Sequence, residues 1–303
     1  MNIQWYPGHM TKAKRMMEEN IKLIDCVVEL LDARTPLSSQ NPELPRIAGA
    51  KPRLILMTKM DLADPSETEA WVAYFKEQGI LAMPVNSRDG QNMNKVVPLI
   101  HEACKERIER NRNRGLINKP LRIMVAGIPN VGKSTFINKL VGKASAKTGN
   151  KPGVTKGKQW INIKKGLELL DTPGILWPKF EDKTVGYHLA FIGSIKDDIL
   201  DVNALTRKLL EHLILTYPKA LVQSFPCVEP YLANDVLSQA KNNEQEMDRL
   251  THQLLSEITL SRNLLKEGNK PDFDRMSKLF LDEFRAGKYG RITIDLVRER
   301  RKL

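Results

Sequence analysis

One segment constrains the fold and chemistry of this chain more than any other, residues 121–140, LRIMVAGIPNVGKSTFINKL. It places Gly127, Gly132, Lys133 and Ser134 in the spacing GxxxxGK[ST], after a strand-like apolar run and before an amphipathic, helix-like run. In such a loop the backbone N–H groups converge on a phosphate, the lysine reaches the β and γ oxygens, and the serine hydroxyl ligates Mg²⁺. The segment therefore predicts a nucleoside di- or triphosphate site. The loop residues predicted to bind are Asn130, Val131, Gly132, Lys133, Ser134 and Thr135.

Short apolar runs alternate with helical patterns in the first part of the chain. The apolar runs, each ending in polar turn residues, are 26–34, 53–61, 81–87 and 121–127. Helix-like spacing covers 12–22, 65–78 and 93–110. Short apolar runs of this kind are typical of buried parallel strands. The alternation predicts an α/β fold, with a doubly wound, mostly parallel sheet that binds its ligands at the carboxyl ends of the strands.

After Pro178 the strand-like runs stop and leucines at helical spacing take over, as in Leu205, Leu209 and Leu213. A chain of 303 residues is long enough for two domains. We expect a nucleotide-binding domain over residues 1–179 and an all-α helical domain over residues 180–303. Polar loops are predicted around residues 226–230 and 268–271.

The chain carries a net charge of +12, which suggests a polyanionic partner. Residues 143–165 contain seven lysines and no acidic residue, and residues 105–122 contain seven basic residues against two glutamates. A lysine run is often only a solvated face, but beside a nucleotide site these clusters favour RNA. A third basic cluster, which we expect to bind rRNA phosphates, lies near the C-terminus, at Arg285, Lys288, Arg291, Arg298, Arg300, Arg301 and Lys302.

The sequence predicts a cytoplasmic protein without a membrane span. Its first residues contain no apolar leader, and its apolar stretches are short and end in charge. Cys26, Cys104 and Cys227 are far apart and show no metal-ligand spacing, so we expect reduced thiols and no structural metal.

A base-reading element follows the second apolar run, TKMD, formed by Thr58, Lys59, Met60 and Asp61. It matches the [NT]KxD pattern of GTPases. A carboxylate only accepts hydrogen bonds, so Asp61 can bind the N1–H and N2–H groups of guanine but not adenine. This disfavours a P-loop kinase or ATPase. After the next run, Asn86 and Ser87 are similar to the loop whose backbone caps the guanine O6 atom.

Downstream, the segment DTPG places Asp171 and Gly174 in a DxxG pattern. The carboxylate of Asp171 can hold the Mg²⁺ shell, and the N–H group of Gly174 can sense a γ-phosphate. The glutamine that orients the attacking water in Ras-like enzymes is replaced by Ile175. A hydrocarbon side chain cannot hydrogen-bond water, so the catalytic group must come from elsewhere.

These motifs run in an unusual order, TKMD, NSR, GIPNVGKS, PGVT and DTPG. In this order they resemble the circularly permuted, Ras-like P-loop GTPases. The segments IQWYPGHM, GIPNVGKS, DTPGILWPKFED and FRAGKYGRIT resemble the ribosome biogenesis GTPase A (YlqF-type) family over essentially the whole chain. The resemblance implies a permuted GTPase domain fused to a helical, RNA-binding domain. It also implies binding of GTP and GDP with Mg²⁺, and a role in late maturation of the large ribosomal subunit.

The resemblance also implies roles for three further residues. His9 is the candidate to position or deprotonate the attacking water, and Thr155, in KPGVTK, is a Mg²⁺ ligand beside Ser134 and Asp171. Asn130 resembles the asparagine of potassium-stimulated GTPases, so K⁺ is a further candidate cofactor.

Two hypotheses stay open. The first is a monomeric GTPase that associates with the large subunit and its rRNA when GTP is bound and is released after hydrolysis. The second is an RNA-associated nucleotide sensor with negligible turnover, which Ile175 favours.

Overall fold

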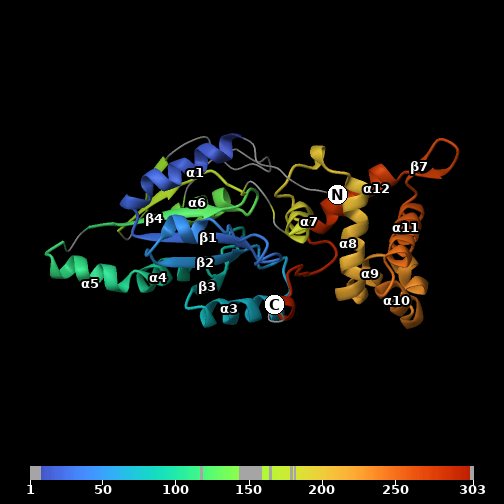
Figure 1. Ribbon diagram of the computed structural model, residues 1–303, viewed down its shortest axis with the longest axis horizontal. Coiled ribbons are helices and arrows are strands. Elements are labelled where there is room, and N and C mark those ends of the chain that lie inside the picture. Colours follow the sequence, from blue (N-terminus) through green and yellow to red (C-terminus); the bar gives the residue numbers. More distant parts are fainter. Residues whose placement is uncertain are drawn as a thin grey trace.

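The computed structural model describes residues 8–116, 119–142, 159–163, 166–177, 180 and 182–300. Figure 1 shows an elongated molecule, with a β-sheet and its helices at one end and a group of helices at the other. Helix α7 lies between the two ends (Figure 1). In the part of the chain that the structure describes, no helix is long and apolar enough to cross a membrane.

The main sheet has six strands in the order β3-β2-β1-β4-β6-β5. All neighbouring strands run parallel except β5, which is antiparallel to β6. The prediction of a mostly parallel, doubly wound sheet is therefore confirmed, and four of its strands lie inside the predicted runs. The strands are β1 Cys26–Asp32, β2 Arg53–Thr58, β3 Leu81–Pro84, β4 Leu121–Gly127, β5 Gln159–Ile163 and β6 Leu167–Asp171.

Helices bury both faces of the sheet, as the alternation of β2 shows. Ile55 and Met57 belong to an apolar cluster with Trp71 of α3, whereas Leu54 and Leu56 belong to the larger core cluster. Because successive strand residues point to opposite faces, an apolar run buried throughout fits a sheet covered on both sides. The elements around the sheet are α1 Gly8–Asn20, η1 Ile21–Leu23, α2 Leu44–Ala48, α3 Pro65–Glu77, α4 Met93–Ala103, α5 Lys105–Asn113 and α6 Lys133–Val141.

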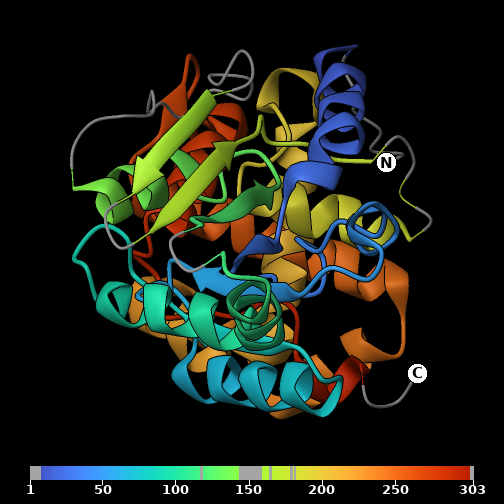
Figure 2. The same cartoon turned by 90° about the vertical axis from the view of Figure 1, so that its left-hand side faces the viewer.

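The single helix predicted over residues 93–110 is wrong in one respect, because the chain forms two helices that meet at Cys104. Helix α4 buries Met93, Val96 and Ile100 against the core. Helix α5 has the almost wholly polar sequence KERIERNRN and lacks a continuous apolar face to hold it on the sheet. It therefore extends outward at the left-hand end of the molecule in Figure 1, the end that faces the viewer in Figure 2.

The other end of the molecule is mainly helical, as the leucine spacing predicts. The long helices α8, α11 and α12 pack on one another through leucine, isoleucine and phenylalanine side chains. The elements are α7 Lys183–Phe191, η2 Asp197–Ile199, α8 Val202–Thr216, α9 Pro218–Ser224, η3 Pro226–Tyr231, α10 Asn234–Lys241, α11 Glu244–Ser261, β7 Leu265–Lys266, β8 Lys270–Pro271, α12 Phe273–Arg285 and α13 Val297–Arg300.

Two loops predicted in this half are short elements instead. Residues 226–231 form a 3₁₀ helix that packs against α11 and buries Val228, and Pro226 at its start suits a helical first turn. Residues 265–271 form a small antiparallel hairpin whose turn holds Asn269 and Gly268 at positive φ. Both residue types tolerate that backbone region better than other residues do.

Three members of the C-terminal basic cluster, Arg285, Lys288 and Arg291, already have partners within the fold. Arg285 forms an ion pair with Asp197 and donates to the carbonyl oxygens of Ala190 and Phe191. Lys288 pairs with Glu283. Residues 291–297, here called the return segment, run back to the sheet, where Val297 joins the apolar cluster of Trp71. Arg301, Lys302 and almost all of the lysine run of residues 143–165 lie outside the described residues.

Candidate nucleotide site

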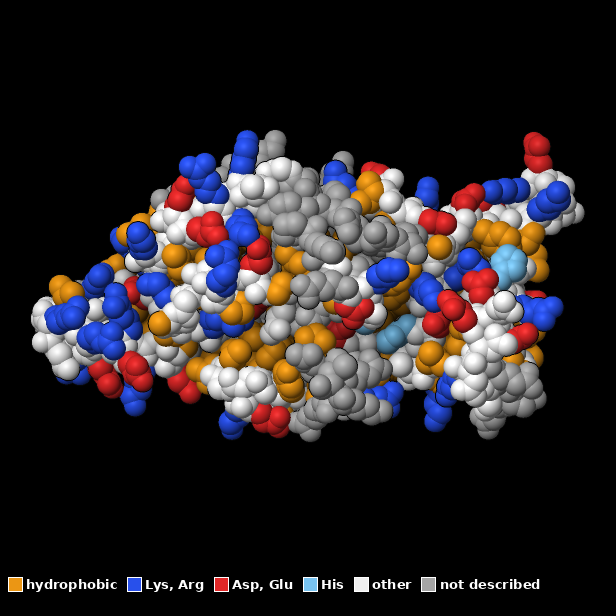
Figure 3. Space-filling view, in the orientation of Figure 1, with side chains coloured by type: hydrophobic (Ala, Val, Ile, Leu, Met, Phe, Trp, Pro, Cys, Tyr) orange, Lys and Arg blue, Asp and Glu red, His pale blue; other side chains and the backbone are white. Residues whose placement is uncertain are grey.

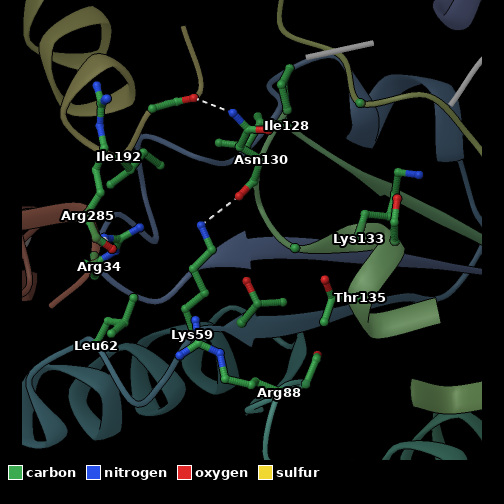
Figure 4. A pocket seen from close by; sticks show the side chains of 18 of the residues that line it. Arg34, Lys59, Leu62, Arg88, Ile128, Asn130, Lys133, Thr135, Ile192 and Arg285 are labelled. Carbon is green, nitrogen blue, oxygen red and sulfur yellow. Dashed lines mark hydrogen bonds between the residues drawn. The ribbon is translucent and has the colours of Figure 1, made fainter. Parts of the chain in front are cut away.

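A cavity of about 880 Å³ opens at the carboxyl ends of the central strands and brings the predicted motifs together. Figure 4 shows their side chains converging on it from the sheet loops and from the helical half. It lies where ligands of open α/β sheets bind, because the loops after parallel strands meet at one edge. The predicted residues that line it are Thr58, Lys59, Asp61, Asn86, Ser87, Asn130, Gly132, Lys133, Ser134, Thr135 and Gly174.

The other predicted site residues lie elsewhere. Met60, Val131 and Asp171 are absent from the cavity lining. Val131 is fully buried, and Asp171 lies beneath Lys133, with which it pairs. His9 is in α1, but its side chain, like the whole of Thr155, lies outside the described part of the structure.

The phosphate-binding loop has the backbone that its sequence predicts. Gly132 has φ +94°, a backbone conformation that is strained for residues with a side chain, and α6 begins at the next residue, Lys133. The amino end of α6 therefore faces the cavity, where its N–H groups favour an anion. Ser134 and Thr135, in the first turn, line the same space.

Lys133 is buried and forms an ion pair with Asp171, the aspartate of DxxG. Burial lowers the pKa of the Lys133 ammonium group, and the charge of Asp171 partly opposes that shift. The other carboxylate oxygen of Asp171, Oδ2, is buried and has no hydrogen-bond partner among the described residues. An unpartnered carboxylate oxygen beside the phosphate-binding lysine fits Mg²⁺ or its bound water, since hard cations prefer oxygen ligands.

The DxxG turn lies against the phosphate-binding loop. A Cβ atom on Gly174 would come within 3.0 Å of the backbone nitrogen of Pro129, so glycine is required for this approach. The next residue, Ile175, donates its N–H to the carbonyl of Gly127 and is only 2% exposed. The side chain at this position belongs to the core, so it cannot orient water in the cavity.

The TKMD element is tied to the phosphate-binding loop. The Thr58 hydroxyl donates to the carbonyl oxygens of Leu31, at 3.0 Å, and Val131, at 2.6 Å. The Lys59 ammonium donates to Asn130 O at 2.7 Å (Figure 4). These bonds hold the base-reading and phosphate-binding elements at a fixed separation.

The Asn86 side chain shapes its own loop. Its amide oxygen accepts from the N–H groups of Arg88 and Asp89, and its amide nitrogen donates to the Asp89 carboxylate. Asparagine commonly folds turns in this way. The loop therefore presents backbone and the neighbouring Ser87 to the cavity, as the predicted cap of the guanine O6 atom requires.

Sequence reasoning missed a buried charge cluster that joins these elements. Arg34 makes a two-pronged ion pair with Asp32, and Lys59 donates to the same carboxylate at 2.8 Å. Burial alone would raise the pKa of Asp32, but these two cations hold it well below its ordinary value. The segment DAR at the end of β1 was a signal, since a buried strand that ends in adjacent opposite charges favours a buried pair.

The helical half also lines the cavity, which no local sequence signal indicated. Gly193, Lys196, Asp197 and Arg285 contribute to the wall. Asn130 has positive φ and donates to Gly193 O at 2.6 Å, so the phosphate-binding loop contacts the segment after α7.

Comparisons with known proteins agree with this geometry. Residues 122–220 match the family described as 50S ribosome-binding GTPase. Ribosome biogenesis GTPase A of Priestia megaterium is 45% identical over 97% of both chains. The protein of the same name from Bacillus cereus is 43% identical over 99% of this chain and 95% of its own. The GDP-bound structure of TM YlqF matches with a TM-score of 0.64 and 25% identity, covering 93% of this chain and 99% of that one.

Identity of this extent over the whole length, together with a phosphate-binding loop, DxxG and TKMD around one cavity, settles the family. Membership implies that the protein binds GTP and GDP, typically with Mg²⁺. The chain therefore belongs to the ribosome biogenesis GTPase A family of circularly permuted, Ras-like P-loop GTPases.

Proposed function

We propose that the protein hydrolyses GTP to GDP and phosphate and uses this cycle to assist late assembly of the large ribosomal subunit in the cytoplasm, acting as a monomer. The observation that carries the proposal is the single cavity that joins Lys133, Gly174 and Asp61. A γ-phosphate and a guanine base can be sensed there by one rigid set of loops. The names of the relatives, ribosome biogenesis GTPase A and mitochondrial ribosome-associated GTPase 1, support a ribosomal partner.

In the proposed site, each motif binds one part of the nucleotide. Asp61 accepts from guanine, with Lys59 and Met60 beside it and the loop of Asn86 and Ser87 over the base. Residues 130–135 hold the phosphates. Ser134, Asp171 and Thr155 ligate Mg²⁺, and Gly174 senses the γ-phosphate. This division places each donor opposite the nucleotide group that it can satisfy.

We propose the exposed part of the basic cluster at residues 105–122 as an rRNA-facing surface. Lys and Arg side chains gather at the end of the molecule formed by α5, on the left in Figure 3. Among the described residues no hydrogen bond or ion pair engages the side chains of this group, which is Lys105, Arg110, Arg112, Arg114 and Lys119. Phosphate groups would neutralise this cluster and release counterions.

The division into domains 1–179 and 180–303 also remains our proposal, with the return segment packed on the first domain.

The test is GTP turnover with and without large ribosomal subunits, combined with co-sedimentation in GDP and in a non-hydrolysable GTP analogue. We expect subunits to raise turnover, and the protein to sediment with them when the analogue is bound. If subunits bind but turnover stays negligible, the nucleotide-sensor hypothesis replaces hydrolysis, and the burial of Ile175 gives its physical reason.

His9→Ala should lower subunit-stimulated turnover by about 10²-fold, the usual scale for a positioned acid–base group, and leave GTP affinity close to that of the unmodified protein. We propose this role because Ile175 cannot supply a water-orienting group. The matched control is His101→Ala on α4, a histidine outside the cavity lining. Equal stimulated rates for His9→Ala and the control would remove His9 from the mechanism.

We further propose that Asn130 helps to bind K⁺ beside the phosphates. The bond from its Nδ2 atom to Gly193 O supports this, since it fixes the side chain and leaves the amide oxygen available. Replacing Na⁺ with K⁺ should raise turnover at least about tenfold, because a fixed cation stabilises developing negative charge. Asn130→Ala should erase the difference between the two salts. A rate that is the same in both salts before mutation would exclude the potassium role.

A further inference from the structure

The return segment follows the loop that carries the guanine-reading carboxylate. Arg291 donates from Nε to Ala63 O and from Nη2 to Met60 O, both at 2.8 Å. The N–H group of Ile292 donates to Leu62 O at 3.0 Å. The carbonyl groups of residues 60, 62 and 63 therefore all bond to a segment more than 200 residues away in the sequence.

The contact continues on both sides of these bonds. The N–H group of Asp64 donates to Thr293 Oγ1 at 3.1 Å, and that of Val297 donates to the Glu67 carboxylate at 3.1 Å. Gly287 packs so closely that a Cβ atom there would lie 2.6 Å from Leu62 Cδ2. The C-terminal part of the chain thus contacts the loop after β2 at residues 60, 62, 63 and 64, while Asp61 lines the cavity.

Buried contacts fix the return segment in place, so it can hold the loop after β2 in a defined position. Residues 292–297 are all buried. The Asp295 carboxylate accepts from the N–H and hydroxyl groups of Ser38 and contacts His188 of α7. Trp71 Nε1 donates to Asp295 O, and the N–H group of Ile294 donates to Arg34 O. These partners come from both halves of the molecule.

We infer that Arg291 is a positioning residue for guanine specificity, acting through Asp61. Two charge-assisted hydrogen bonds fix the carbonyl groups just before and two residues after this aspartate. Among the described residues, no hydrogen bond uses the Asp61 carboxylate itself, so its orientation depends on its backbone. Discrimination by a pair of hydrogen bonds requires that their acceptor be held to within about 0.5 Å by its supporting residues.

This inference rests on the proposed guanine site and adds a consequence for the helical half. The return segment continues directly from α12, through residues 286–290. Binding free energies are reciprocal, so if docking of the segment orders the guanine loop, guanine must in turn favour docking of the segment. Guanine binding at Asp61 is thereby coupled to the docking of the segment that continues from α12, and this coupling does not require a γ-phosphate.

The experiment measures the affinities of GDP and inosine diphosphate for the full chain and for Arg291→Ala. Inosine lacks the 2-amino group. The dissociation constant of inosine diphosphate divided by that of GDP therefore reports on the Asp61 contact alone. We expect Arg291→Ala to lower this ratio about fivefold, which is the scale of a partly exposed, charge-assisted hydrogen bond. Arg291→Lys should restore only part of it, because an ammonium group lacks the planar fork that reaches both carbonyls.

The matched control is Arg275→Ala, an exposed arginine of α12 whose side chain makes no hydrogen bond or ion pair among the described residues. Its ratio should equal that of the unmodified protein. Equal losses of GDP and inosine diphosphate in Arg291→Ala would indicate general destabilisation and overturn the inference, as would an unchanged ratio. If the unmodified protein does not prefer GDP over inosine diphosphate, the guanine site itself is wrong, which is a separate failure.

Hydrogen exchange gives a second measurement that does not depend on substitution. The N–H groups of Ile292 and Ile294 bond to Leu62 O and Arg34 O. Their exchange should slow severalfold when GDP is added, and less when inosine diphosphate is added at equal saturation. Exchange that responds equally to both nucleotides would contradict a coupling that passes through Asp61.

Discussion

Lys133→Ala should abolish measurable binding of GDP and GTP and also lower the free energy of unfolding. The first effect follows from the loss of the only lysine of the phosphate-binding loop, a residue that lines the cavity. The second follows from its ion pair with the buried Asp171, which is only 1% exposed. Removing one partner of a buried pair leaves an uncompensated charge and costs about 3 kcal/mol or more.

The two effects can be separated by neutralising the partner. The double variant Lys133→Ala, Asp171→Asn has no stranded carboxylate, so it should regain most of the lost stability and still fail to bind nucleotide. Thermal unfolding and nucleotide titration of both variants measure this. Lys139→Ala, an exposed lysine of the same helix, is the control and should change neither property. Nucleotide binding that survives in Lys133→Ala would place the phosphates elsewhere.

The ion pair between Lys133 and Asp171 also bears on how the site works. Both residues are assigned to nucleotide or Mg²⁺ by their motifs, yet in the structure Lys133 pairs with Oδ1 of Asp171. When nucleotide and Mg²⁺ bind together, a phosphate can replace Asp171 as the anionic partner of Lys133, and the cation can replace Lys133 as the cationic partner of Asp171. The buried pair therefore keeps the cavity stable until nucleotide and Mg²⁺ bind, and we expect each to bind weakly without the other.

The sequence was sufficient to predict the parts of the fold that depend on local patterns. Strands β1, β2 and β4 were found because a strand buried on both faces is a continuous apolar run, and the partly buried edge strand β3 was found from its own short apolar run. The cavity was found because each motif follows such a run, and parallel strands bring their carboxyl ends to one edge. The permuted order of the motifs does not affect this inference, because strands that lie side by side bring their carboxyl ends to the same edge whatever their order in the sequence.

The parts that were missed depend on contacts between distant segments. Arg285 and Arg291 looked like a phosphate-binding tail because their sequence neighbours are basic. Their carbonyl and carboxylate partners, at residues 60, 63, 190, 191 and 197, lie on elements far away in the sequence. Composition gives the charge of an arginine but not whether the fold has already satisfied it.

The contacts of Thr58 also could not be predicted from the sequence, where the match to [NT]KxD shows only that threonine occupies the first position of the motif. In the structure its hydroxyl donates to two backbone carbonyls, one of them in the phosphate-binding loop. Thr58 is 2% exposed, and its buried hydroxyl links the base-reading and phosphate-binding elements. A one-residue comparison of motifs cannot reveal a bond to a residue 73 positions away.

Asp61→Asn should convert the protein from a guanine binder to a xanthine binder. Asp61 lines the cavity, and its carboxylate is not used in any hydrogen bond among the described residues, so it is available to the base. In asparagine an amide nitrogen replaces one carboxylate oxygen; it can donate to the 2-oxygen of xanthine but cannot accept from the 2-amino group of guanine. Losing a bond to a charged acceptor costs about 3 kcal/mol at most, so GDP affinity should fall by up to about 100-fold.

Titration with GDP and xanthosine diphosphate measures the switch. The ratio of the two affinities should reverse in Asp61→Asn, and thermal stability should stay close to that of the unmodified protein. Asp64→Asn is the matched control in the same loop. Its carboxylate caps α3 by accepting from Ser66 and Glu67, a role that asparagine fills equally well, so its GDP preference should be unchanged. An Asp61→Asn protein that still prefers GDP would show that TKMD does not read the base. In that case the phosphate-binding loop would remain the nucleotide site, and guanine selection would have to come from the loop of Asn86 and Ser87.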